Sequence, residues 1–170
     1  MALTVRPGVD VLGMGELDRL SARPWFLEYA YSDWERAFAA ELGATRRREF
    51  LAGRFAAKEA VVKALGRGFG GGIQPRCVEI HRRRDGAPQV RLHGAAADLA
   101  DTLAASVHVS IAHKGDLVVA VAFTSSCIRS APNCWPHSRV EEPPRCQFPP
   151  PSPPGSGSGS ADGTLTTEVT

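Results

Sequence analysis

The pattern of residues 45–65 predicts a long helix that carries two different stripes along its length. At about 100° per residue, large apolar side chains share one stripe: Leu51, Phe55, Val62 and Leu65. The neighbouring stripe has small residues, one acid and one amine: Ala52, Ala56, Glu59 and Lys63. A helix that needs charge only for solubility carries it opposite its core. The small residues therefore predict room for a ligand beside Glu59 and Lys63, although a Glu four residues before a Lys is also a common surface pair.

The remaining patterns predict short strands and helices without a regular βα alternation. Strands are expected at 5–11, 76–84, 88–93, 107–113 and 117–123, and further helices at 16–22, 33–42 and 94–105. Ser32 and Glu35 form a capping-box signature, and Thr45 is expected to cap the long helix. Asp85-Gly86 indicates a tight hairpin turn. This order favours an α+β domain in which a small antiparallel sheet packs on the long central helix.

Composition divides the 170-residue chain into two parts. Residues 1–124 are expected to fold as one domain, whereas proline, glycine and serine dominate from Ser125 onward. Such a composition cannot bury enough apolar surface to fold, so a disordered tail is expected over 125–170. Three of the four cysteines fall in this tail at irregular spacing, which argues against a zinc site and a disulfide framework.

The first residues lack the long apolar region of a signal peptide, and no segment approaches the ~18 apolar residues of a membrane span. A cytoplasmic location without membrane contact is therefore expected. Between residues 46 and 67, seven basic side chains stand against two acidic ones. This local field favours an acidic partner or a polyphosphate, and a small nucleic-acid-binding domain is one alternative. The folded part, however, has no cluster of aromatic residues for base stacking, so no nucleic-acid partner is expected.

Two further segments add polar groups to strands. Gly8-Val9-Asp10-Val11 places an acid in a β-branched run, and residues 107–113 alternate apolar and polar side chains before a turn. Together with residues 47–66 and Gly86-Ala87-Pro88, in this order, they resemble the holo-acyl-carrier-protein synthase family of single-lobe 4′-phosphopantetheinyl transferases. The resemblance covers about residues 5–124. Such enzymes move the phosphopantetheine arm of coenzyme A onto a serine of an acidic apo acyl carrier protein and release 3′,5′-ADP.

The resemblance implies a Mg²⁺-dependent transfer and a role for each matching residue. Asp10 and Glu59 would bind Mg²⁺, which takes one or two carboxylates together with substrate phosphates. Lys63 would neutralise phosphate charge or help to deprotonate the serine, and His113 would complete the catalytic set near the phosphates of coenzyme A. The residues expected to contact coenzyme A are Arg54, Lys58, Lys63, Gly66, Gly68, Pro88, Ser110 and His113.

The folded residues offer only a shallow surface for a ligand as large as coenzyme A. The resemblance implies that a homotrimer solves this by closing each site between neighbouring subunits. The hairpin strands would then bury one face between subunits, including Val109, Ile111, Val119 and Val121, although packing on their own helix is equally compatible with the pattern. A catalytically silent module that only docks acidic carrier proteins is a further alternative. Whether the carrier serves fatty-acid or polyketide synthesis stays open.

Overall fold

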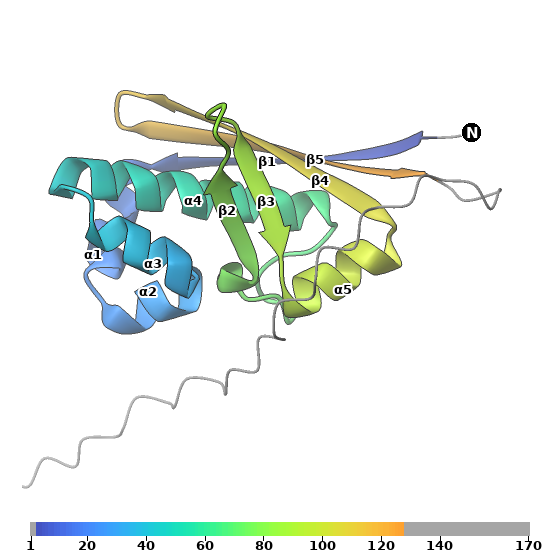
Figure 1. Cartoon of the computed structure of the whole chain (residues 1–170), viewed down its shortest axis with the longest axis horizontal. Coiled ribbons are helices and arrows are strands. Elements are labelled where there is room, and N and C mark those ends of the chain that lie inside the picture. The colour runs from blue at the N-terminus through green and yellow to red at the C-terminus, as the bar shows by residue number, and fades with distance from the viewer. Residues whose placement is uncertain (1–2, 128–170) are drawn as a thin grey trace, which may run out of the picture.

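The computed structural model describes residues 3–127. Their elements confirm the expected α+β class, with a small antiparallel sheet on a long central helix (Figure 1). In the sheet, β5 (Leu117–Cys127) lies between β1 (Leu3–Gly13) and β4 (Ala105–Lys114), and both pairings are antiparallel. A separate hairpin joins β2 (Val78–Arg82) to β3 (Pro88–Leu92) and crosses the long helix in Figure 1.

The helices surround this framework. In chain order they are η1 (Met14–Leu17), α1 (Asp18–Ser21), α2 (Pro24–Ala30), α3 (Asp33–Ala40), α4 (Ala44–Ala64), η2 (Pro75–Cys77) and α5 (Gly94–Thr102). The helices α1, α2 and α3 gather at one end of the molecule, and α5 lies at the other (Figure 1). None of the helices within residues 3–127 is both long and apolar enough to cross a lipid bilayer.

The core lies between α4 and the inner face of the sheet. Small residues on α4 let β1 approach so closely that a Cβ atom on Gly8 would lie 2.0 Å from the carbonyl oxygen of Ala60. The alanines of the second stripe are part of this core, because Ala52 and Ala56 are buried. The space beside them is therefore filled by the protein itself, which corrects the expectation that a ligand would enter there.

Most of the expected elements are present with shifted ends. The capping box of α3 is formed, because the Ser32 hydroxyl accepts from the Glu35 amide and the Glu35 carboxylate accepts from the Ser32 amide. The Asp85-Gly86 turn is also formed, with Gly86 at φ +88°. Helix α4, however, is capped by Gly43 rather than Thr45.

Two differences concern whole segments. The sequence patterns missed α2. Its first residue is a proline, which is a favoured helix start, but the aromatic residues that follow did not give a clear helical pattern. Strand β5 also continues to Cys127, where its last residues pair with the start of β1. The ordered strand thus extends three residues past the expected boundary at 124. The remainder of the expected tail, 128–170, lies outside the described residues.

Candidate active site

Asp10 and Lys63 meet where β1 crosses the last turns of α4. The ammonium Nζ of Lys63 lies 2.8 Å from Oδ1 of Asp10 and also donates to the carbonyl oxygen of Val9 at 3.2 Å. Asp10 lies opposite Ala120 on the inner face of the sheet, so its carboxylate is held near α4. The ion pair remains partly open to solvent, because 45% of the Lys63 side chain is exposed.

Glu59, one turn before Lys63, belongs to the same cluster. Burial raises the pKa of Glu59, the negative charge of Asp10 raises it further, and the ammonium of Lys63 opposes both effects. Two carboxylates that repel one another in this way form a site in which a cation is stabilised. Within residues 3–127, no third acidic, histidine or cysteine side chain joins them as a ready-made metal cluster. Two hard oxygen donors with an open side fit Mg²⁺, which keeps waters and takes substrate phosphates as its other ligands.

Tyr29 is a neighbour of this cluster that the sequence patterns did not reveal. Burial raises the pKa of its hydroxyl, and the charge of Glu59 raises it further. The residue lies on α2, which was not predicted, and so no periodic signal could place it beside Glu59. Its hydroxyl is consequently a neutral hydrogen-bonding group at the edge of the acidic pair.

A second group of expected residues lines a cavity of about 200 Å³ between α4, the β2–β3 hairpin and β4. Arg54, Pro88 and His113, which are all expected to contact coenzyme A, lie on its wall. The structure adds two cationic or titratable neighbours, His81 and Arg82, which had not been singled out. None of the residues that line the cavity is acidic. Two guanidinium groups and two imidazoles around so small a space form a site suited to a phosphate group.

Packing holds the two expected side chains of this cavity in place. The guanidinium of Arg54 lies 4.2 Å above the ring of Phe50 and donates to the carbonyl oxygen of Ile80 at 3.3 Å. Burial lowers the pKa of Arg54, the negative charge of Glu35 opposes this shift, and the positive charge of Arg82 adds to it. An anion in the cavity would relieve the repulsion between the two guanidinium groups. His113 lies against α4 at Gly53, where a Cβ atom would be 3.0 Å from Nε2 of the ring.

Lys58 is not in either group, which corrects the expectation that it contacts phosphate. Its side chain is 0% exposed, and Nζ lies 2.6 Å from Oε2 of Glu35 and 3.2 Å from the carbonyl oxygen of Pro75. The other carboxylate oxygen of Glu35 accepts from the amide of Ile80. The pair therefore ties α4 to α3 and β2. A coenzyme A phosphate cannot reach this ammonium without opening the core.

Ser110 and His113 lie on opposite faces of the sheet. Successive side chains alternate along a strand, so a spacing of three places them on different sides. His113 shares the inner face with Val109 and Ile111, which pack against the core, whereas Ser110 is exposed on the outer face. Gly66 and Gly68 follow the end of α4, and Gly66 has φ +77°, which favours glycine.

The two groups of expected residues are also separated around α4. Arg54 and Lys63 are nine residues apart, which corresponds to about 180° around the helix and about 14 Å along it. Arg54 and Glu59 differ by about 140°. One chain thus presents the carboxylate pair on one side of α4 and the cationic cavity on another.

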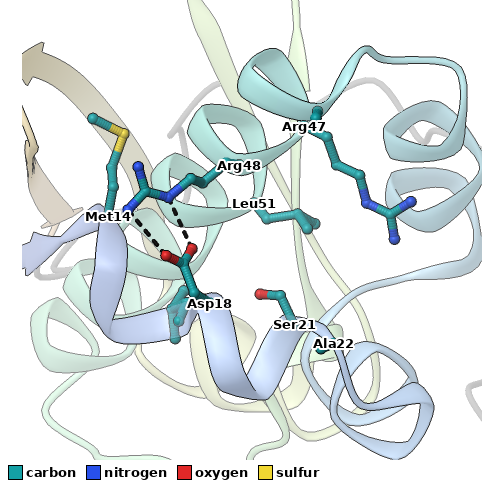
Figure 2. Close-up of a pocket in the computed structure, with 9 residues that line it drawn as sticks. Met14, Asp18, Ser21, Ala22, Arg47, Arg48 and Leu51 are labelled. Atoms are coloured by element: carbon teal, nitrogen blue, oxygen red, sulfur yellow. Dashed lines mark hydrogen bonds and ion pairs between the residues drawn. The ribbon is translucent and has the colours of Figure 1, made fainter.

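A third feature lies at the start of α4, where a cavity of about 290 Å³ opens between this helix, η1 and α1 (Figure 2). Arg48 and Asp18 close one side of it, with Nε of Arg48 2.8 Å from Oδ1 of Asp18. Arg47 stands apart from that pair in Figure 2. The adjoining surface of α1 and α2 carries Arg19 and Arg23 beside an exposed Trp25. Of the basic residues expected between 46 and 67, Arg47 and Arg48 line the cavity at the start of α4, and Arg48 is already paired within the chain.

Comparison with known proteins identifies the family to which this chain belongs. A model of the 4′-phosphopantetheinyl transferase superfamily matches residues 6–122. A holo-[acyl-carrier-protein] synthase of Desulfovibrio desulfuricans is 43% identical over 117 residues, which cover 67% of this chain and 91% of that protein. The corresponding synthase of Nitratidesulfovibrio vulgaris (strain Hildenborough) is 54% identical over 78 residues, which cover 45% of this chain and 63% of that protein.

Among solved structures, a holo-(acyl-carrier-protein) synthase from Bacillus anthracis in complex with CoA (3′,5′-ADP) has a TM-score of 0.63 at 30% identity. The match covers 74% of this chain and all of that one. The chain therefore belongs to the 4′-phosphopantetheinyl transferase superfamily, in its single-lobe form. Within it, the chain belongs with the holo-acyl-carrier-protein synthases, enzymes that transfer phosphopantetheine from coenzyme A to an acyl carrier protein.

Proposed function

We propose that this chain performs the Mg²⁺-dependent transfer with Asp10, Glu59 and Lys63 at the reacting phosphate. In the reaction, a bond forms between the carrier serine oxygen and a phosphorus of the coenzyme A pyrophosphate, a P–O bond to 3′,5′-ADP breaks, and the serine loses its proton. The observation that supports this best is the meeting of two carboxylates and one ammonium where β1 crosses α4.

Each residue has a role that follows from its contacts. Asp10 and Glu59 would hold Mg²⁺, which when bound neutralises phosphate charge. Lys63 is the cation nearest to both, and its half-exposed ammonium can turn from Asp10 toward the charge that develops on the leaving phosphate. Arg54 and His113 would bind a phosphate of coenzyme A in the cationic cavity.

We propose further that the complete site forms between subunits of a homotrimer. A ligand that bridges the carboxylate pair and the cationic cavity of one chain would have to pass around α4. A neighbouring subunit that covers the outer sheet face and extends past the edge strand β1 would bring its own cavity to the pair and give the exposed Ser110 a place in a site. That face carries cross-strand apolar pairs, with Val9 beside Val121 and Val11 beside Val119. Val109 and Ile111 belong instead to the inner face and pack within their own chain.

An acidic carrier protein would dock on the basic surface of α1 and α2. Arg19 and Arg23 lie there beside the exposed Trp25 and Leu20, so that charge and apolar area are adjacent. Opposite charge on the partner steers the encounter and sets its orientation, while a buried aromatic ring supplies affinity. Arg47 lines the cavity at the start of α4, apart from the Arg48–Asp18 pair (Figure 2), and would add a further positive charge.

The test is transfer to an apo carrier protein in the presence of coenzyme A and Mg²⁺, followed by mass spectrometry. The wild-type chain should add one phosphopantetheine to the carrier. Glu59→Gln keeps the size of the side chain but removes its charge, and it should lower the rate by about a hundredfold or more. Removing Mg²⁺ with a chelator should have a similar effect on the wild type.

Glu49→Gln is the matched control, because it removes an acid from the same helix about three turns away and should retain activity. A Glu59→Gln chain with wild-type turnover and unchanged Mg²⁺ dependence would refute the assignment. A wild-type chain that binds the carrier without modifying it would instead identify a docking module.

A further inference from the structure

His81 lies on the wall of the cationic cavity, together with Arg54, Arg82 and His113. These four side chains come from three elements, since Arg54 is on α4, His81 and Arg82 are on β2, and His113 is on β4. Neighbouring residues of a strand point to opposite faces, so His81 and Arg82 reach the cavity from different sides of β2. The imidazole of His81 is therefore an additional polar group beside a space with no acidic lining.

Glu79 fixes the orientation of this imidazole. Its Oε1 contacts Nε2 of His81 on the same face of β2, and both side chains are largely buried. Burial raises the pKa of Glu79, but hydrogen bonds from Ser32 and His81 outweigh it, so the net pKa is lowered. Glu79 is thus a carboxylate that accepts from Nε2. The other ring nitrogen, Nδ1, can donate to an anion when the ring carries both of its protons.

Trp34 holds the ring from α3. The centroids of the Trp34 and His81 rings are 4.0 Å apart, and Trp34 in turn stacks on Phe38 at 5.5 Å. Phe38 contacts Phe50 at 5.0 Å, and Phe50 carries the guanidinium of Arg54 on its face. A continuous row of aromatic rings therefore connects the imidazole of His81 to the guanidinium of Arg54 and restrains both.

We propose that His81 is a further phosphate-binding residue of this enzyme and that it recognises the 3′-phosphate monoester of coenzyme A. This inference rests on the proposed function. A monoester carries a charge of about −1.5 to −2, more than either phosphate of a pyrophosphate diester, and so gains most from two guanidinium groups and an imidazole in one cavity. Glu79 and Trp34 are positioning residues, because they hold His81 and do not line the cavity.

The test compares coenzyme A with dephospho-coenzyme A, which lacks only the monoester. In the wild type, kcat/KM should be higher for coenzyme A. In His81→Gln, this preference should fall by about tenfold, mainly through a higher KM for coenzyme A. His81→Arg, which places a permanent cation at this position, should retain the preference. Trp34→Ala should reduce the preference for coenzyme A while the imidazole itself is retained. This variant tests the inference also if His81→Gln proves unstable.

Calorimetric binding of 3′,5′-ADP and 5′-AMP gives a readout that is independent of the transfer reaction. His81→Gln should weaken binding of 3′,5′-ADP and leave 5′-AMP unchanged. Arg83→Gln is the control, since it removes a cation from the same hairpin but outside the cavity. Its kcat/KM ratio for coenzyme A over dephospho-coenzyme A and its affinity ratio for 3′,5′-ADP over 5′-AMP should both match the wild type. Equal ratios in His81→Gln and the wild type would overturn the inference. A wild type that binds both nucleotides but transfers nothing would overturn the proposed function alone.

Discussion

Lys58 and Glu59 are adjacent in the chain but have unrelated roles. Glu59 joins the acidic pair near solvent, whereas Lys58 is enclosed in the core with Glu35. Burial lowers the pKa of Lys58, and the charge and hydrogen bond of Glu35 oppose this shift. A buried charge is tolerated only while its partner is present. The pair therefore fixes how α4 is seated against α3, and with it the direction in which Glu59 points.

Glu35→Gln should accordingly lower the free energy of unfolding by about 3 kcal/mol, because it leaves the Lys58 ammonium buried without a counter-charge. Chemical denaturation measures this loss. Asp33→Asn is the control: it breaks an exposed pair with Arg36 on the same helix, and should change stability little. Pairing Glu35→Leu with Lys58→Met should restore much of the lost stability. An unchanged midpoint in Glu35→Gln would show that the pair does not hold these helices.

At the scale of elements, the position of the acidic pair depends on how closely β1 lies on α4. The strand carries Gly8 where it crosses the helix, and Ala60 and Ala64 occupy the facing positions. A side chain at Gly8 would meet the backbone, which cannot rotate away as a flexible side chain can. Two residues later on the same strand face, Asp10 reaches Lys63 because of this separation. A larger gap would leave Asp10 too far from α4 to share a cation with Glu59.

Gly8→Ala should therefore destabilise the fold by about 3 kcal/mol, because it moves β1 away from α4. It should also raise the Mg²⁺ concentration needed for half-maximal transfer, because Asp10 moves away from Glu59. Thermal melting and a Mg²⁺ titration of the transfer rate measure the two effects. Gly70→Ala is the matched control, because a Cβ atom there would meet nothing within 4 Å. Full stability and activity in Gly8→Ala would mean that the helix and strand can separate without cost.

At the scale of the whole molecule, the outer sheet face is apolar and uncovered in a single chain. Val11 is 58% exposed, and Val5, Val9 and Phe123 are each about half exposed on the same face. Exposed apolar areas of this kind mark an interaction surface. A second copy is the proposed occupant, because it would supply a cationic cavity to the carboxylate pair, which the cavity of the same chain does not reach.

Val11→Glu should convert the proposed trimer into monomers and abolish transfer, while an isolated subunit keeps its melting temperature. A charge costs little on a solvent-exposed face but is strongly unfavourable in an apolar interface. Light scattering measures the mass, and dilution of the wild type should reduce activity in parallel. Thr4→Glu places the same charge on the other face of the same strand and should leave the assembly intact. A fully active monomer at micromolar concentration would exclude the shared site.

The sequence alone could predict the features that form between residues close together in the chain. Glu59 and Lys63 are neighbours because of helix periodicity, Ser32 and Glu35 close a capping box within four residues, and Gly86 turns a hairpin in place. The opposite faces of Ser110 and His113 were readable in the same way from their spacing of three. The tertiary structure alone decided which charged residue of α4 entered the core and which groups joined Arg54. Burial depends on what packs against a helix face, and partners such as Glu35 and His81 come from elements far away in the chain.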